Sequence, residues 1–242
     1  TDSAAGPAGD GVFLWSGGKL TTVARPGTKV ASGVLTRAWR PTLSPAGVVA
    51  FEGTTADSPG SSTPYSAYVE KDGVITELAT PNTPVPGGTD TFTALRGPHA
   101  DSQGDVALLG QVGGSWGVFL YTAADKMLRA IVKPGDTLPG GGTLTTVESL
   151  RHSIDIDDAG AIVFGAQMDS GDGIFLYQDG KISPVALTGQ DLKGGGHGDE
   201  PGERWLSLVP RRAQQQGAGR LPGHHRRRQD PTGAGDPGGG RS

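Results

Sequence analysis

The stretch SIDIDDAG carries a pattern that could bind a metal, with oxygen-bearing side chains at Ser153, Asp155, Asp157 and Asp158. Alternating carboxylates of this kind can ligate Ca²⁺. A calcium loop of the EF-hand type also needs further oxygen ligands and a late bidentate Glu, and only DIDD is present. In a strand, Asp155 and Asp157 point to the same side and the intervening Ile residues to the other. A half-exposed strand that enters a turn is therefore favoured over a metal site.

Two histidines and a glycine-rich loop are further candidates for chemistry. His99 and His152 occur in GPHAD and RHSID without a third ligand or a nucleophile motif. We interpret both as turn or surface residues. The loop PGGGTLTT, which begins at residue 139, lacks the Gly-Lys-Ser/Thr ending of phosphate-binding loops, and no helical pattern follows it. The sequence thus predicts no catalytic residue, no metal site and no cofactor.

Trp39 and Trp116 stand at the ends of expected loops, where exposed indole rings can bind sugars. Packing of the two rings between structural units is the favoured alternative. Which of the two applies depends on the elements around these rings, and those elements follow from an internal repeat.

The sequence repeats with a period of about 55 residues. The motif GVFLW at 11 recurs as SAYVE at 66, GVFLY at 117 and GIFLY at 173, which aligns Phe13, Tyr68, Phe119 and Phe175. A loop follows each copy, with the sequences RPGTKVASG at 25, TPNTPVPGG at 80, KPGDTLPGG at 133 and TGQDLKGG at 188. Several anchors recur in one order with one period, so the chain is a tandem repeat.

A turn motif forms the third anchor of the repeat. Its copies are Ser44-Pro45-Ala46-Gly47, Asp101-Ser102-Gln103-Gly104 and Asp157-Asp158-Ala159-Gly160. A type I turn favours Asp, Asn or Ser at its first position and Gly at its fourth. The acceptor side chain bonds backbone amides of the turn, and Gly supplies a positive φ. We therefore interpret six residues as a structural turn motif: Ser44, Gly47, Asp101, Gly104, Asp157 and Gly160.

Each repeat predicts four strands. GVFLY is apolar at consecutive positions, which is typical of a strand buried on both faces, and KLTTVA or KISPVA forms a hairpin with it. A third strand near LTRAWRPTL and a final strand such as GVVAFEG follow. The sequence predicts an all-β fold, a β-propeller-like array of four-stranded antiparallel repeats that forms an incomplete ring. The alternative is an open stack of β-repeats that does not close.

Composition agrees with many short strands and tight turns. Gly accounts for 42 of 242 residues, and both Gly and Pro interrupt helices. The absence of Cys excludes disulfides and thiolate metal sites. No run of 18 apolar residues occurs, so no membrane span is predicted. The opening TDSAAGPAGDG indicates a removed signal or a fragment.

The repeated pattern resembles a family of bacterial surface proteins. The pattern Asn-x-x-Gly-x-x-x-Phe, with GxFLY strands and PGDxLPGGG loops between its copies, is similar to that of choice-of-anchor tandem repeat, NxxGxxxF-containing proteins. In this chain Ser44, Asp101 and Asp157 replace Asn, and Leu108 replaces Phe in the second copy. The resemblance covers roughly residues 11 to 209. It implies a secreted or cell-surface bacterial β-repeat protein, and it brings no catalytic residues.

The period divides the chain into units that we expect to be structural. We predict a lead-in at 1–10, repeats at 11–64, 65–116 and 117–172, a partial fourth repeat at 173–209, and a tail at 210–242. The tail has seven Arg against two Asp, a charge of +5 in a chain of net charge −4. A basic arm for nucleic acid and a disordered tail are two interpretations of it.

A third interpretation of the tail is a shifted reading frame. The next turn motif is due to place its Gly near residue 217. A shift by one nucleotide across Ala213 to Leu221 permits Leu-Asn-Asn-Arg-Gly-Gln-Val-Ala-Phe, which is the missing motif in register. We therefore predict a disordered basic tail that arises from a frameshift. Its HHRRR cluster is then no site, and no nucleic-acid partner is predicted.

The favoured function is that of a non-catalytic extracellular or cell-surface β-repeat protein, a binding or adhesion module whose repeat loops meet a glycan or a protein. The alternative is a fragment of a propeller glycosidase or sialidase-like enzyme whose catalytic residues lie partly in missing blades. Such an enzyme requires two carboxylates about 5 to 10 Å apart in a cleft.

Overall fold

The computed structural model describes residues 9–56, 64–148 and 153–190. These residues form strands and loops, with no helix among them, and they belong to one compact unit, Thr1–Asp199. No helix in the described ranges is therefore long and apolar enough to span a membrane. The predicted tail at 210–242 and His152 lie outside the described residues.

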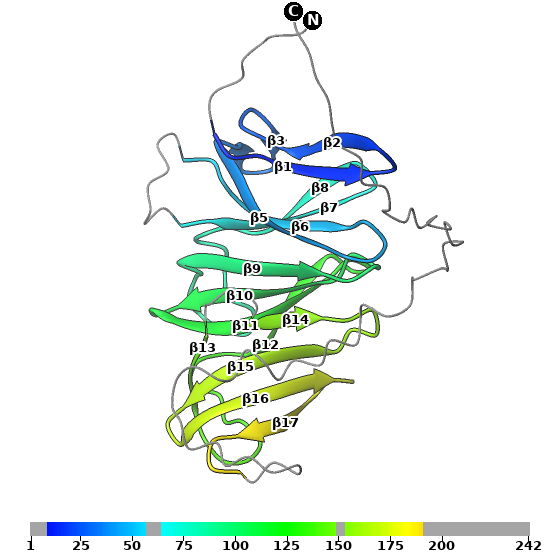
Figure 1. Ribbon diagram of the computed structural model, residues 1–242. Coiled ribbons are helices and arrows are strands. Elements are labelled where there is room, and N and C mark those ends of the chain that lie inside the picture. Colours follow the sequence, from blue (N-terminus) through cyan, green and yellow to red (C-terminus); the bar gives the residue numbers. More distant parts are fainter. Residues whose placement is uncertain (1–8, 57–63, 149–152, 191–242) are drawn as a thin grey trace, which may run out of the picture. The chain divides into compact units, whose positions relative to one another are not determined.

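Three antiparallel sheets follow one another along the chain (Figure 1). The first sheet has the order β5 (Arg37–Leu43), β6 (Val49–Thr54), β7 (Ser66–Lys71), β8 (Val74–Ala79). The second sheet has the order β9 (Ala94–Ala100), β10 (Val106–Val112), β11 (Ser115–Thr122), β12 (Met127–Val132). The third sheet has the order β13 (Leu144–Val147), β15 (Ile162–Met168), β16 (Gly171–Gln178), β17 (Lys181–Leu187), and β14 (Ile154–Ile156) also pairs with β15.

A two-stranded half-sheet precedes the first sheet. It consists of β1 (Val12–Ser16) and β2 (Lys19–Ala24), and the following loop contains the short pair β3 (Lys29–Val30) and β4 (Gly33–Val34). The three complete sheets share one internal arrangement. In the complete sheets, the strand after the turn motif pairs with the GxFLY-type strand of the next repeat. Each complete sheet thus combines strands from two consecutive repeats.

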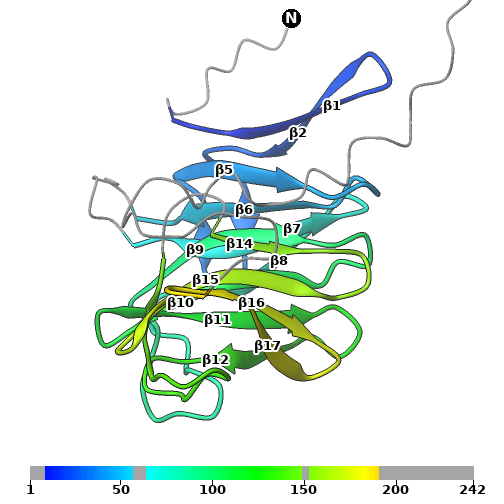
Figure 2. The same ribbon diagram turned by 60° about the horizontal axis from the view of Figure 1, so that its bottom comes forward.

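The sheets pack face to face, so their central strands are buried on both sides (Figure 2). In β10, Val106 and Leu108 enter the core shared with the first sheet, whereas Ala107 and Leu109 enter the core shared with the third. Successive apolar residues are thus needed because each side of the strand meets a different sheet. The prediction of an all-β, β-propeller-like array of antiparallel sheets is confirmed, with four strands in each of the first two sheets and five in the third.

The aromatic residue of the GxFLY-type strand anchors each sheet. A register shift directly precedes Phe13, Tyr68, Phe119 and Phe175, which is the same irregularity in all four copies. Tyr68, Phe119 and Phe175 are fully buried, but Phe13 is 51% exposed. The difference arises because the described part of the chain supplies no sheet that covers this face of β1.

Candidate functional site

One edge strand from each of three successive sheets, β5, β9 and β14, lies beside the next, and we call these strands together the inner edge. The hydroxyl of Thr42 on β5 donates to the carbonyl of Pro98 on β9 at 2.7 Å. His99 Nδ1 on β9 lies 3.1 Å from Asp155 Oδ1 on β14. Polar contacts therefore link the sheets at this edge, while apolar cores link their faces.

The turn-motif residues lie at the turns before β6, β10 and β15. Ser44 Oγ accepts one hydrogen bond, from the Val48 amide at 3.1 Å. Asp101 Oδ1 accepts three amide hydrogen bonds, from Gln103, Gly104 and Asp105 at 2.8, 2.8 and 2.9 Å. Asp157 Oδ1 accepts two, from Ala159 and Ala161 at 2.9 and 2.8 Å. Gly47, Gly104 and Gly160 have φ values of 87°, 94° and 76°. These side chains serve the backbone of their own turns.

The carboxylates of SIDIDDAG have separate partners and do not converge. Asp155 contacts His99, Asp157 caps its turn, and Asp158 Oδ1 accepts the Ser102 amide at 2.8 Å. Hydrogen bonds from Ser102 hold the pKa of Asp158 below its ordinary value. Within the described ranges, no group of three or more His, Asp or Glu side chains is placed to hold a metal ion. Asp155 and Asp158 instead join the second sheet to the third.

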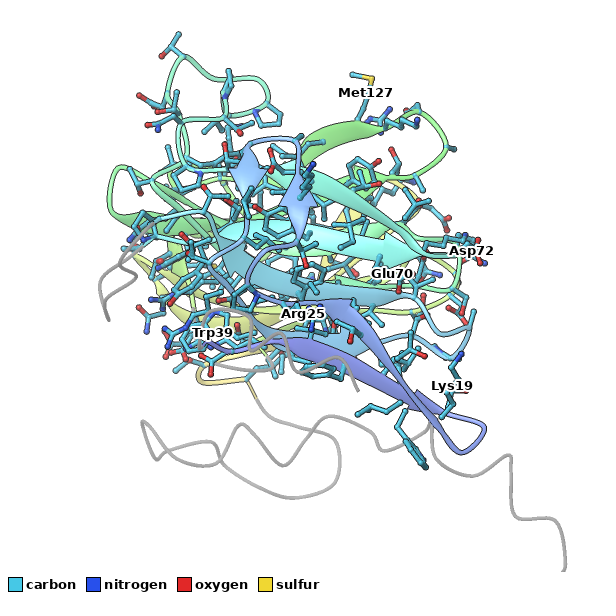
Figure 3. All side chains as sticks on the ribbon, turned by 90° about the horizontal axis from the view of Figure 1, so that it is seen from above. Lys19, Arg25, Trp39, Glu70, Asp72 and Met127 are labelled. Carbon is cyan, nitrogen blue, oxygen red and sulfur yellow. The ribbon has the colours of Figure 1, made fainter. Side chains whose placement is uncertain are left out.

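The two candidate indoles lie in a group of side chains that sequence patterns alone did not single out. Around Trp39, the guanidinium of Arg40 lies 4.3 Å and that of Arg37 lies 5.0 Å from the ring centroid, and the Tyr65 ring lies 4.8 Å away. Arg37 also donates to Tyr65 Oη at 3.1 Å and pairs with Asp10 at 2.8 Å. Trp39 is half-buried, and it lies on the opposite side of the sheets from Lys19, the first residue of β2, and from the turn residue Asp72 (Figure 3).

Glu52 joins this group through Arg40 and is only 1% exposed. Its Oε2 pairs with Arg40 at 3.3 Å, and its Oε1 accepts the Gly97 amide of the second sheet at 3.0 Å. Burial raises the pKa of Glu52, although the Gly97 amide and the charges of Arg40 and Arg96 act in the opposite direction. A single carboxyl thus connects β5, β6 and β9.

The second sheet adds a similar stack to the group. The guanidinium of Arg96 lies 5.1 Å from the centroid of Trp116, which is 8% exposed. The Trp116 amide donates to Thr146 Oγ1 of the third sheet at 2.9 Å. Neither indole is an exposed platform for a sugar, since an arginine lies over each ring. We call the following set the inner-edge cluster: Arg37, Trp39, Arg40, Glu52, Tyr65, Arg96 and Trp116.

The glycine-rich loop after residue 139 has a local structural role. Leu138 donates its amide to the Gly142 carbonyl at 2.9 Å, and the Gly141 amide donates to the Leu138 carbonyl. Gly140 has a φ of 101°, and a Cβ there would lie 2.8 Å from Leu187. The glycines therefore permit a tight turn against β17.

One signal in the sequence does point to Glu52. The central strands are apolar at consecutive positions, yet VVAFEG places a Glu at the position that Leu109 and Gly165 occupy in the next two sheets. A charged residue in a strand buried on both faces is an exception to the pattern. Arg40 and Arg96 do not stand out in the sequence in this way, because arginine is ordinarily exposed and is not unusual in a strand at the edge of a sheet.

The comparison with known proteins yields similarity to parts of larger structures. No family model and no curated protein matches this chain. TolB from Acinetobacter baumannii is 12% identical with a TM-score of 0.42, over 72% of this chain and 36% of TolB. An acylaminoacyl peptidase from Pyrococcus horikoshii is 16% identical with a TM-score of 0.36, over 57% of this chain and 19% of the peptidase. A putative gluconolactonase is 16% identical with a TM-score of 0.35, over 72% of this chain and 55% of that chain. This chain spans less than two thirds of each.

Proposed function

We propose that the protein is a non-catalytic extracellular or cell-surface β-repeat protein that binds a glycan or a protein through the inner-edge cluster. The observation that carries the proposal is the buried carboxyl of Glu52, held between Arg40 and the Gly97 amide. The extracellular or surface location rests on the motif resemblance given above.

Glu52 is not required by the fold. The equivalent positions in the second and third sheets, each paired with the residue before the anchoring aromatic, hold Leu109 and Gly165. Removing a charged group from water costs several kcal/mol before its partners are counted. Local departures from the rules of folding are concentrated at functional sites. Glu52 and its partners therefore serve something other than packing.

The residue types around Glu52 are those that dominate binding energies. Trp, Tyr and Arg are enriched among the residues whose truncation weakens an interface most. Here they project from strands or from positions next to them, and stacking and hydrogen bonds fix Arg37 and Arg40 against Trp39 and Tyr65. Rigid groups lose little conformational entropy when a ligand binds. The cluster is thus suited to recognition.

The non-catalytic part of the proposal is supported by the environment of Glu52. Hydrolysis of a glycosidic bond needs a second carboxyl about 5 to 10 Å from the first. The groups that act on Glu52 are the guanidiniums of Arg40 and Arg96 and the Gly97 amide. Such partners fix a carboxyl in place, which suits a positioning role better than proton transfer.

Binding to immobilised ligands tests the proposal. The full chain is passed over polysaccharides (dextran, polygalacturonate, dextran sulfate) and matrix proteins (collagen, fibrinogen), and affinities are measured by biolayer interferometry. We expect at least one surface to bind, and the Trp39→Ala variant to bind it at least about 10-fold more weakly. The matched control is Trp15→Ala, since Trp15 is 67% exposed on the half-sheet.

Two results contradict the proposal. Equal weakening by Trp39→Ala and Trp15→Ala places binding elsewhere, provided that thermal unfolding shows both variants folded. Release of new reducing ends from a bound polysaccharide favours the enzyme alternative.

A further inference from the structure

The inner-edge cluster has more positive than negative charge. Three guanidiniums, from Arg37, Arg40 and Arg96, are matched by two carboxylates in ion pairs, Asp10 with Arg37 and Glu52 with Arg40. Arg96 makes no ion pair with any carboxylate in the described ranges. The chain as a whole carries a net charge of −4, so this positive surplus is local. A local surplus of guanidinium groups attracts anions.

The two indoles support the arginines and do not face a ligand themselves. The guanidinium carbons of Arg40 and Arg96 lie 4.3 and 5.1 Å from the centroids of Trp39 and Trp116. Cation–π stacking of this kind holds a guanidinium in one orientation while its N–H groups stay at its rim. A ligand that reaches the cluster therefore meets N–H donors before ring faces.

The cluster also has more hydrogen-bond donors than acceptors. Each guanidinium has five N–H donors and no acceptor. Arg40 uses its Nη1 on Glu52, whereas its buried Nε and the buried Nε1 of Trp39 have no partner. The side chains of Arg37 and Arg40 are 29% and 34% exposed. The exposed parts of these two guanidinium groups, and not the buried nitrogens, are the donors that a ligand rich in acceptor oxygens can reach.

We propose that Arg37, Arg40 and Arg96 bind the oxyanion groups of an acidic polysaccharide. This inference rests on the proposed binding function and specifies its ligand. Guanidinium groups form bidentate, charge-assisted hydrogen bonds with carboxylates and similar oxyanions. The arginines occur on the first strands of two neighbouring sheets, β5 and β9, which lie side by side. A polymer with repeated anionic groups can contact both strands at once, and each added contact raises the overall affinity.

Glu52 is a positioning residue in this site. It is buried beneath the exposed part of Arg40 and holds that arginine, while the Gly97 amide fixes the carboxyl itself. Its charge partly opposes an incoming anion. Arg96 is the better residue to substitute, since it contributes charge to the site without an ion pair in the described structure.

Titration of the full chain with defined polymers tests the inference. Polygalacturonate supplies carboxylates, dextran sulfate supplies sulfates, dextran is neutral, and polyglutamate stands for an acidic protein. Affinities are measured by tryptophan fluorescence and biolayer interferometry at two salt concentrations. The variants are Arg96→Gln, Arg96→Lys and the control Arg25→Gln, which removes the same charge from an exposed loop position (Figure 3).

We expect polygalacturonate or dextran sulfate to bind, dextran not to bind, and salt to weaken the binding. Arg96→Gln is expected to weaken binding at least about 10-fold, because hydrogen bonds to charged groups are stronger than those between neutral groups. Arg96→Lys is expected to recover only part of the loss, since Lys lacks the planar fork. Arg25→Gln should change the affinity less than about twofold. The preferred acidic polymer then identifies carboxylate or sulfate as the recognised group.

The outcomes separate this inference from the proposed function. Dextran binding that Trp39→Ala abolishes and Arg96→Gln leaves intact overturns the oxyanion site but keeps the binding function. Tighter, Arg96-dependent binding of polyglutamate overturns the polysaccharide assignment in favour of an acidic protein. Equal losses in Arg96→Gln and Arg25→Gln show general charge attraction only, and absence of binding to every polymer likewise overturns the inference.

Discussion

The first and second sheets differ at positions that the repeat makes equivalent. In the first sheet Phe51 pairs with Tyr68 and the rings stack at 5.3 Å. In the second sheet Leu108 pairs with Phe119, and Phe92 packs edge-on to Phe119 at 4.8 Å. Both arrangements bury the anchoring aromatic completely. The loss of one ring is thus compensated by another from a loop position.

A second difference between the two sheets has no such compensation. Glu52 and Arg40 of the first sheet correspond to Leu109 and Gly97 of the second. Arg40 and Gly97 both have positive φ values, 49° and 53°, which favour glycine. The first sheet therefore keeps a strained arginine and a buried carboxyl where the second shows that neither is needed. The comparison therefore distinguishes the aromatic residues, which the core needs, from Glu52 and Arg40, which it does not need.

The largest loss of stability is expected when Phe92, the ring that compensates for Leu108 in the second sheet, is removed. Phe92→Ala should destabilise the protein by about 3–5 kcal/mol, because a fully buried ring leaves a cavity. Chemical denaturation with guanidinium chloride measures the change. The double variant Phe92→Leu with Leu108→Phe, which gives the second sheet the residues of the first, should stay within about 1.5 kcal/mol of the wild type. A loss below about 1 kcal/mol in Phe92→Ala would show that the ring of Phe92 does not take the place that the ring of Phe51 has in the first sheet.

The next largest change in stability is expected for Glu52 and Arg40, the pair that has no counterpart in the second sheet. Glu52→Leu should destabilise the protein by about 2–3 kcal/mol, since Arg40 and the Gly97 amide lose a charged hydrogen-bond partner. Adding Arg40→Gly, which copies the second sheet, should recover at least half of that loss by removing the unpaired charge and relieving the positive φ. Denaturation of the single and double variants gives the coupling energy. A double variant less stable than Glu52→Leu alone would mean that the fold itself needs Arg40.

The sheets could be predicted from the sequence because the patterns that specify their strands are local and repeated. Consecutive apolar residues such as those of GVFLY predict burial on both faces, and the spacing of Phe119 and Phe175 predicts equivalent strands. It could not predict that Phe13 is exposed, since burial of that ring depends on a neighbouring sheet and not on its own motif. The inner-edge cluster as a whole could not be predicted for the same reason, although the Glu in VVAFEG marks Glu52 as an exception in its strand. Arg40, Glu52 and Arg96 meet only after two sheets pack, and no local pattern encodes that contact.

A smaller effect is expected at the turns, where the two sheets use different acceptors. Asp101 Oδ1 accepts three amide hydrogen bonds, whereas Ser44 Oγ accepts one. Asp101→Ser should therefore destabilise the protein by about 1 kcal/mol, the typical value of a net hydrogen bond. The reverse exchange, Ser44→Asp, should leave stability unchanged or higher. Thermal unfolding monitored by circular dichroism compares the variants, and equal stability of Asp101→Ser and wild type would contradict the difference between the turns.

The smallest effect is the pH dependence that Glu52 gives to the first sheet and that Leu109 cannot give to the second. Burial raises the folded-state pKa of Glu52 above its ordinary value of 4.5. The Gly97 amide and the charges of Arg40 and Arg96, which are the groups of β5 and β9 that act on the carboxyl, lower the pKa but do not cancel the effect of burial. A raised folded-state pKa means that the folded protein binds the proton more tightly than the unfolded chain. The resulting stability is complete below pH 4.5 and is lost as the pH rises through the folded-state pKa.

Comparison with a neutral side chain isolates this contribution. The wild type should lose stability relative to Glu52→Gln as the pH is raised from 4 to about 8, because Gln cannot ionise. Asp72→Asn is the matched control, since it removes one negative charge at an exposed turn residue whose φ of 54° Asn also tolerates. Urea denaturation at several pH values measures the difference. A wild type that gains stability over Glu52→Gln with rising pH would show that pairing with Arg40 outweighs burial, and the carboxyl would then favour the folded state.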